Sequence, residues 1–284
     1  MKRKILLPTD FSKNSWNAIE YALKLFKNDE CVFYFLNVFT ATQNVYDILI
    51  NFEPGSELYE LSKAKSEQGL VRILDVLDVE GYKNPKHHFE TISTFNYPLE
   101  AIKNIVEQKD IEMIVMGTKG ETNSTQIAYG RTAIYVMEKV RNCPVIVVPE
   151  KANHTLPKEI VFPTSYKTHY KRRELIYLIE IAIKCDAKIA ILHVSEEEKL
   201  TNNQIENKQL LTEIFEDVSC SFHELKYNSV EAAINIFIES RDSNMVAFIN
   251  KKHYFFGSVL TQPLVKEMGF HSNIPILVMH DLRN

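Results

Sequence analysis

The stretch KILLPTDF at Lys4–Phe11 recurs later in the chain as EIVFPTSY at Glu159–Tyr166. Each copy is an apolar run that ends in Pro-Thr, a small polar residue and an aromatic residue. A short, continuous apolar run bounded by turn residues is typical of a strand that is buried on both faces. The repeat therefore predicts two copies of one structural unit, each of which begins with a buried strand.

Further along the chain, four more phrases repeat in the same order. The matching pairs are 35–38 with 191–194, 96–102 with 228–234, 111–116 with 244–249, and 143–148 with 274–279. They predict five strands in each half, and the segments between them are long enough for helices. Strands that alternate with helices pair in parallel through right-handed crossovers. We therefore expect an α/β fold with two tandem five-stranded parallel-sheet units of Rossmann-like type.

The chain divides naturally between the two copies. At 284 residues it is long enough for two domains that each bury a core. We expect a first domain at 1–150, a polar linker at 151–157 that ends in Pro157, and a second domain at 158–284. The first copy is longer than the second, and we expect a surface loop near 40–56.

The composition excludes several classes of protein. Hydrophobic residues make up 45% and charged residues 25%, and the net charge of -4 gives no electrostatic basis for binding nucleic acid or an anionic membrane. The basic start is followed by only three apolar residues, and no run approaches the roughly 18 that a membrane helix requires. We expect a cytoplasmic protein. The four cysteines form no C-x-x-C pair, so we interpret them as small buried apolar residues.

Ligands of an open parallel sheet bind beyond the carboxyl ends of its strands. This rule selects the loop after the first strand, at Pro8, Thr9 and Asp10, and the loop after the fourth, which follows Met116. The second of these contains three of the eight glycines in the chain, Gly117, Gly120 and Gly130. Glycines let backbone N–H groups approach phosphate oxygens, and the helix that follows Gly130 adds unpaired donors. Turn formation alone explains such glycines about as well.

Both loops resemble the universal stress protein family. The spacing Gly117-x2-Gly120-x9-Gly130 is similar to the nucleotide motif G-x2-G-x9-G-[S/T] of that family, and residues 5–12 are similar to its N-terminal signature. The resemblance covers nearly the whole chain as two copies, so that the chain is identified as a tandem member. It implies an adenine-nucleotide α-hydrolase-like fold and a role in stress responses, with or without bound ATP.

The resemblance also implies roles for individual residues. Asp10 would contact the adenine or ribose, and the backbone of Val38 would hydrogen-bond adenine. The phosphates, accompanied by Mg²⁺, would be bound in the glycine loop, whose candidate residues are Gly117, Lys119, Gly120, Gly130, Arg131 and Thr132. Arg131 departs from the motif, which has Ser or Thr there. Its guanidinium could bind a phosphate or obstruct it.

The second half departs much further from the motif. Ser165 replaces Asp10, and residues 250–253 (NKKH) replace the first two glycines of the motif. We expect no nucleotide site of the family type there. Tyr254, Phe255 and Phe256 are expected to be packing residues.

Three functional hypotheses remain open. The first is a nucleotide-binding sensor or regulator that uses the N-terminal half and a protein partner that the sequence does not identify. The second is a nucleotide-independent interaction or small-ligand protein, and the third is a slow ATPase. No side chain stands out as a nucleophile or general base, so we predict no catalytic residue. The adjacent His87 and His88 point to opposite faces of a strand, so we predict no metal site.

The final strand of each copy is apolar and follows a proline. Family members look like dimers joined through their final strands, and a chain with two copies can make that pairing within itself. We therefore expect residues 145–148 and 276–279 to pair and form an intramolecular pseudo-dimer, which would cover two apolar edges. A further homodimer of the whole chain is also compatible with the sequence.

Overall fold

The computed structural model describes residues 2–40, 53–118, 130–152, 155–195, 199–227, 229–250 and 274–281. Its strands form one ten-stranded sheet in the order β3-β2-β1-β4-β5-β10-β9-β6-β7-β8. The strands are β1 (Arg3–Pro8), β2 (Cys31–Phe39), β3 (His87–Phe95), β4 (Met113–Gly117), β5 (Val145–Val148), β6 (Glu159–Pro163), β7 (Lys188–Ser195), β8 (Cys220–Lys226), β9 (Met245–Asn250) and β10 (Ile276–His280).

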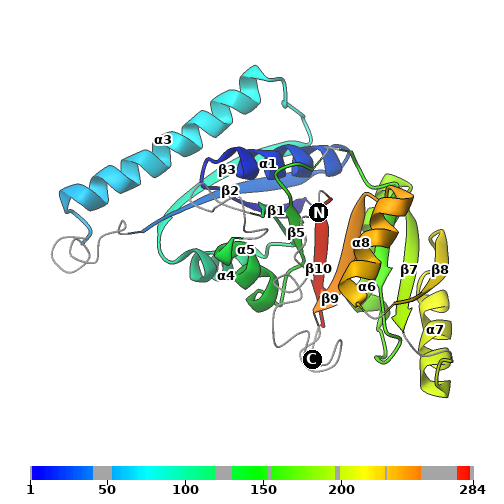
Figure 1. Cartoon of the computed structure of the whole chain (residues 1–284). Coiled ribbons are helices and arrows are strands. Elements are labelled where there is room, and N and C mark those ends of the chain that lie inside the picture. The colour runs from blue at the N-terminus through cyan, green and yellow to red at the C-terminus, as the bar shows by residue number, and fades with distance from the viewer. Residues whose placement is uncertain are drawn as a thin grey trace.

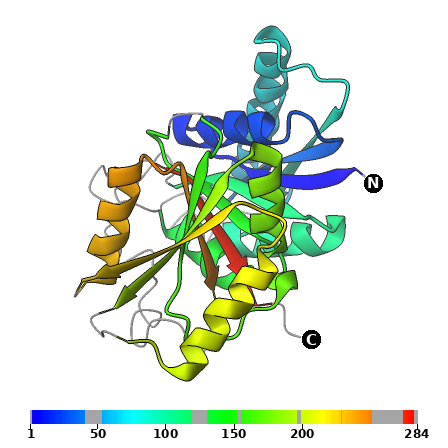
Figure 2. The same cartoon turned by 90° about the vertical axis from the view of Figure 1, so that its right-hand side faces the viewer.

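Helices cover both faces of this sheet, as expected for a parallel α/β fold. In Figure 1, α1 and α3 lie above the N-terminal strands and α4 and α5 lie below them. In Figure 2, α8 (orange) lies on the left of the C-terminal strands, whereas α6 and α7 lie on the right. The helices are α1 (Lys13–Leu25), α3 (Glu57–Val79), α4 (Pro98–Lys109), α5 (Arg131–Lys139), α6 (Arg172–Cys185), α7 (Asn202–Ile214) and α8 (Val230–Arg241).

Side-chain alternation along the strands divides the core into two layers. In β1, Ile5 and Leu7 belong to the layer beneath α1, α3, α6 and α7, whereas Leu6 belongs to the layer beneath α4, α5 and α8. Successive residues of a strand point to opposite faces, so a strand buried on both sides must be apolar at every position. This is why continuous rather than alternating apolar runs marked the strands in the sequence.

Two equivalent sets of five strands meet at the centre of the sheet. Strands β5 and β10 pair antiparallel, with Ile276 opposite Val147 and Val278 opposite Val145, and they lie side by side in the middle of Figure 1. The other strand pairs are parallel. The predicted tandem α/β architecture and the pairing of the two final strands are confirmed.

The local signals at several element ends are simple. Ser12 caps α1 by accepting a hydrogen bond from Ser15 N–H, and Thr201 forms a capping box with Gln204 at α7. Pro98 begins α4, where its missing N–H costs nothing. Three helices end at an aspartate in the left-handed conformation, namely Asp110, Asp186 and Asp242. Asp110 and Asp242 follow equivalent helices of the two copies.

Other sequence expectations have mixed outcomes. Most of the region 40–56 where we expected a loop, namely 41–52, lies outside the described residues, and α3 begins at Glu57. Cys31 and Cys143 are buried as predicted, but Cys185 and Cys220 are only partly buried. Burial raises the pKa of Cys31 to about 12 and that of Cys185 to about 11, so both thiols are protonated at neutral pH. Among the described residues, no helix could span a bilayer and no cluster of side chains suits a metal ion.

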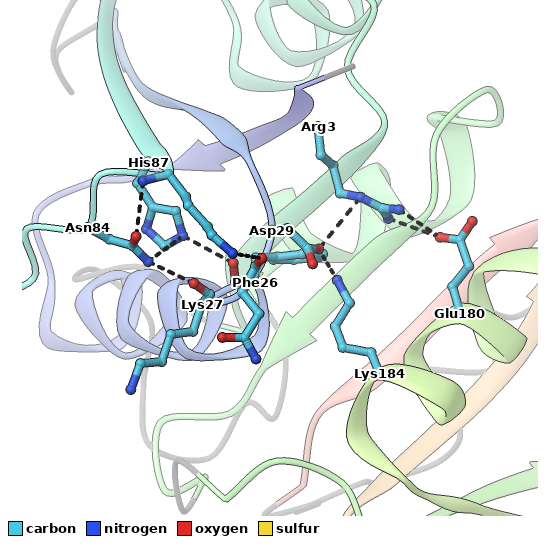
Figure 3. A network of polar contacts seen from close by, with 10 residues as sticks. Arg3, Phe26, Lys27, Asp29, Asn84, His87, Glu180 and Lys184 are labelled. Carbon is cyan, nitrogen blue, oxygen red and sulfur yellow. Dashed lines mark hydrogen bonds and ion pairs between the residues drawn. The ribbon is translucent and has the colours of Figure 1, made fainter.

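A polar network joins the two halves on the side of α6 (Figure 3). Both terminal nitrogens of Arg3 donate to Glu180 Oε2, at 3.0 and 3.1 Å. Asp29, in the turn after α1, accepts from Lys184 of α6 and lies 3.9 Å from Arg3 Nε. Burial disfavours the charged form of Arg3. The hydrogen bonds to Glu180 and the negative charge of Glu180 outweigh this effect, so the pKa of Arg3 is raised. The network therefore links β1 directly to the C-terminal half.

We expect Glu180→Gln to lower the free energy of unfolding by about 0.5–1 kcal/mol, because the ion pair is partly exposed. Urea unfolding at low and high salt measures this, and the loss should shrink at high salt, where the pair is screened. Glu206→Gln is the matched control, since Glu206 is exposed on α7 and forms no ion pair within the described residues. Equal effects of the two substitutions would contradict a role for the network.

Candidate functional site

A pocket of about 210 Å³ lies at the carboxyl ends of β1, β2 and β4. Strands β1 and β4 are neighbours in the sheet, yet the helices that follow them, α1 and α5, cover opposite faces. Crossovers that leave neighbouring strands in opposite directions open a crevice between them, which is where open α/β sheets bind ligands. The topology alone thus accounts for the position of the pocket.

The pocket brings together eight of the eleven residues that the sequence suggested. They are Pro8, Thr9, Asp10, Val38, Met116, Gly117, Gly130 and Thr132. Arg131 is exposed at the first position of α5 and does not line the pocket. Lys119 and Gly120 lie outside the described residues.

Six further residues line the pocket and were not singled out from the sequence. They are Ser15, Leu36, Pro98, Ile102, Thr118 and Ala133. Two of them carried a usable signal. Leu36 lies two residues before Val38 in β2 and so shares its face, and Ile102 lies one helical turn after Pro98 in α4.

The loop after β1 is tightly bonded to its surroundings. Thr9 N–H donates to Leu36 O at 2.8 Å, and Thr9 O accepts from Asn37 Nδ2 at 2.7 Å. The Thr9 hydroxyl bonds to Ser15 Oγ and accepts from Phe11 N–H, both at 3.0 Å. These bonds hold Phe11 in the left-handed conformation, with φ of 66°. The loop therefore presents Asp10 from a fixed backbone.

Asp10 has a local role as well as a place in the pocket. Its Oδ1 accepts from Ser12 N at 3.2 Å and from Ser12 Oγ at 2.6 Å. Ser12 in turn caps α1, so the carboxylate stabilises the turn into that helix. Asp10 is exposed, and it is the only ionisable side chain among the described residues that line the pocket.

The backbone of Val38 faces the same space. Leu36 O accepts from Thr9 N–H, so the polar groups of Leu36 point towards β1, and those of Val38, two residues later, point in the same direction. Strand β1 ends at Pro8, which lies opposite Leu36. No residue of β1 therefore lies opposite Val38, and its N–H and C=O point into the pocket region.

Gly117 has a packing reason of its own. A Cβ atom at this position would lie 3.0 Å from the side chain of Asn14 and equally close to its backbone oxygen, nearer than the roughly 3.5–4.0 Å of ordinary carbon contacts. Asn14 is buried and donates from Nδ2 to Thr118 Oγ1 at 3.1 Å. The close approach of α1 to β4 thus favours glycine here, whether or not a ligand binds.

Gly130 is the N-cap of α5, and among the described residues no side chain forms a capping hydrogen bond at this helix end. Gly130, Thr132 and Ala133, all at this end of α5, line the pocket. The first N–H groups of a helix have no partners within the helix, and the helix dipole adds a partial positive charge there. Together these features are suited to an anion.

The equivalent loop of the second half has a matching backbone hydrogen bond but different side chains around it. Thr164 N–H donates to Leu192 O at 2.8 Å, and His193 Nδ1 lies 2.9 Å from Thr164 O, in the place of Asn37. Tyr170 OH bonds to Thr164 Oγ1, where the first half has Ser15. Tyr166 is fully buried and stacks on His193 with ring centroids 4.8 Å apart. Large aromatic side chains therefore pack around this loop in the layer beneath α6 and α7. Residues 254–258 lie outside the described part of the chain.

The described lining of the pocket offers two kinds of recognition chemistry. Apolar walls and backbone polar groups are suited to a planar group, and the start of α5 is suited to an anion.

Comparisons with known proteins point to one family. Residues 1–149 match the model described as "Universal stress protein family". Among curated proteins, Universal stress protein MJ0531 of Methanocaldococcus jannaschii is 29% identical over 147 residues, which cover 51% of this chain and 81% of that protein. Universal stress protein MJ0577 of the same organism is 28% identical over 165 residues, with 53% and 97% covered.

Solved structures resemble the whole chain. A universal stress protein from Archaeoglobus fulgidus DSM 4304 has a TM-score of 0.71 at 20% identity, and the similarity covers 97% of both chains. A putative universal stress protein from Pseudomonas aeruginosa UCBPP-PA14 has a TM-score of 0.61 at 10% identity and covers 98% of this chain. At such identities the likeness is one of fold, and it extends through both halves of the sheet.

Proposed function

The chain belongs to the universal stress protein family, and from that premise we propose that its N-terminal half is an adenine-nucleotide-binding regulatory module. The observation that carries the proposal is the pocket between β1 and β4, which combines apolar walls, the backbone groups of Val38 and the start of α5, whose N-cap is Gly130. These are the features that a base and a phosphate need at opposite ends of one site.

In this proposal the adenine lies between the side chains of β2 and α4. Leu36, Val38 and Ile102 supply apolar contacts, and the Val38 N–H and C=O supply one donor and one acceptor for the edge of the base. Asp10 accepts from a ribose hydroxyl. The pocket of about 210 Å³ is smaller than the roughly 300–1,000 Å³ of sites that enclose a drug-sized ligand. It is therefore expected to hold the base and sugar, with the phosphates towards α5.

We propose ATP as the nucleotide, with the N–H groups at the start of α5 as phosphate donors and Lys119 and Gly120 as further contacts from the family motif. Mg²⁺ would arrive with the phosphates, since this ion is commonly bound through phosphate and carboxylate oxygens. Because Arg131 is exposed and outside the pocket lining, we assign it at most a contact with the terminal phosphates. We propose a regulatory role for this nucleotide site.

We also propose the domain division 1–150, 151–157 and 158–284. It places the boundary between the end of β5 at Val148 and the start of β6 at Glu159. Asn17 Nδ2 donates to Glu150 O at 2.8 Å, which ties the end of the first domain to α1. The second domain then contributes β10 to the shared sheet.

Calorimetric titration with Mg²⁺-ATP tests the function. We expect one site per chain, binding of adenosine, AMP and ATP, and affinity for GTP at least about tenfold weaker, because guanine presents a different edge to Val38. Arg131→Ala is expected to lower the affinity for ATP by no more than about fivefold and to leave the affinity for adenosine unchanged, as for an exposed charge.

Two outcomes would contradict this assignment. Two equivalent sites per chain would show that the second half also binds. If ATP, AMP and adenosine all give no binding heat and do not compete with one another, the nucleotide-independent alternative is favoured.

A further inference from the structure

A second, larger hollow lies on the opposite side of the loop after β1. It is a groove of about 510 Å³ between α1 and α3, which lie together above the N-terminal strands in Figure 1. Its apolar surface comes from Phe11, Trp16, Ile19, Ile73 and Val76. Thr9 and Ser15 line both this groove and the pocket between β1 and β4. The hydrogen-bonded pair Thr9–Ser15 thus separates the groove from the pocket between β1 and β4.

The ring of Phe11 forms one end of the groove and lies against α3. A Cβ atom at Gly69, in the middle of α3, would lie 2.3–2.7 Å from three atoms of that ring, so any other residue at this position would displace the ring. Glycine inside a helix costs about 1 kcal/mol relative to alanine. The left-handed conformation of Phe11 adds a further cost. Both costs accompany an arrangement that leaves the ring 42% exposed beside the groove.

Two cationic side chains line the groove beside this apolar surface. Lys65 and Arg72 are the only charged residues among the described residues that line the groove. They are seven residues apart on α3, so they lie on one face of the helix at a spacing of about 10 Å along its axis. Both are exposed, and neither forms an ion pair or hydrogen bond within the described part of the chain. The described part of the groove therefore combines a hydrophobic surface with two cations that have no acidic partner there.

The second half closes the corresponding space with its own side chains. From α7, Gln204 Nε2 donates to Ser165 O at 2.9 Å, and Asn207 Nδ2 donates to Tyr166 O at 2.7 Å. Gln204 and Asn207 are both buried, and Tyr166, the counterpart of Phe11, is fully buried as well. The fold itself does not require an open groove at this position. The opening is a feature of the N-terminal half.

We propose that the groove between α1 and α3 is a second binding site, for a small organic anion with an aromatic or aliphatic body. The body packs against Trp16 and Phe11, and the acid group is bound by Arg72 and Lys65. An aromatic surface next to two exposed cations matches a ligand of this kind in shape and in charge. The site does not depend on the nucleotide proposal, because its two cations and its apolar surface lie outside the pocket between β1 and β4.

The single tryptophan of the chain makes the test direct, since Trp16 lies in the groove. The probe is 1-anilinonaphthalene-8-sulfonate, an aromatic anion that accepts energy from tryptophan. Titration of the full chain without nucleotide is expected to quench Trp16 emission with one saturable site. Lys65→Gln and Arg72→Gln are each expected to weaken binding by about threefold to fivefold, as for partly solvated charges, and the double substitution by about tenfold or more.

Two controls separate this site from general adhesion of the dye. Lys63→Gln removes a charge from the same helix at a position outside the groove lining and is expected to change nothing. The uncharged analogue 1-anilinonaphthalene is expected to bind more weakly than the sulfonate and with the same affinity to the parent chain and the double variant.

Three results would overturn the proposal. They are equal binding of the sulfonate to the parent chain and the double variant, equal binding of the two probes, and complete displacement of the sulfonate by ATP. The last result would place the probe in the pocket between β1 and β4. A failure of the chain to bind ATP at all would leave the groove proposal unaffected.

Discussion

Val147→Lys is expected to abolish cooperative folding of the full chain. Val147 is fully buried in β5, opposite Ile276 of β10, in the layer that also contains Val145 and Val278. An ammonium group at such a depth either loses its hydration or gives up its proton, at a cost of about 4 kcal/mol or more. That is a large share of the roughly 5–15 kcal/mol by which proteins are stable. Circular dichroism during urea unfolding measures the loss.

Tyr135→Lys is the matched control for this substitution. Tyr135 lies in α5 and is 44% exposed, so a lysine there keeps its ammonium group in water. We expect this variant to unfold within about 0.5 kcal/mol of the parent chain. A Val147→Lys variant that is as stable as the control would contradict the central position of the β5–β10 pair.

The same pairing predicts how the first half behaves alone. A fragment of residues 1–150 would expose the edge of β5 that β10 covers in the whole chain, and an uncovered apolar edge invites pairing with another copy. Light scattering across micromolar concentrations is expected to show self-association. A folded fragment that remains a monomer throughout this range would contradict the view that the second half serves to cover this edge.

Gly130→Val is expected to weaken ATP binding by at least about 100-fold, the loss of one or two hydrogen bonds to a charged phosphate. Gly130 has φ of −67° and ψ of 154°, which other residues also adopt, so the substitution does not strain the backbone. Its branched side chain would instead stand at the wall of the pocket where phosphate approaches the start of α5. Calorimetry with ATP and with adenosine measures the effect.

Gly130→Ser separates charge recognition from simple obstruction. A serine at an N-cap accepts a hydrogen bond from a first-turn N–H group, and so competes with phosphate for the same donors. We expect the affinity for ATP to fall by a few-fold, the affinity for adenosine to stay the same, and α5 to become slightly more stable. If Gly130→Val binds ATP like the parent chain, the phosphates do not lie at α5, and the proposed phosphate position would be wrong.

Much of the fold could be predicted because its signals are local. The strands are buried on both faces, so the apolar runs at Lys4–Phe11 and Glu159–Tyr166 stand out without any knowledge of their neighbours. Once the order of strands and helices is known, chirality and the switch-point rule place the ligand crevice between β1 and β4. This explains why Thr9 and Gly130, which are far apart in sequence, were selected together and meet at one pocket, whereas Val38 was selected through the family resemblance.

The tertiary structure alone decided how individual residues are used. Gly117 suggested a phosphate contact, but the approach of Asn14 from α1 gives it a separate packing reason, and Arg131 lies outside the pocket lining. The Phe11–Gly69 contact and the groove beside it left no signal in the sequence. Such features depend on which faces of α1 and α3 meet and on how far apart the helices lie. Side-chain spacing along one chain determines the face of each element, whereas the distance between two faces is set by all the side chains that pack between them.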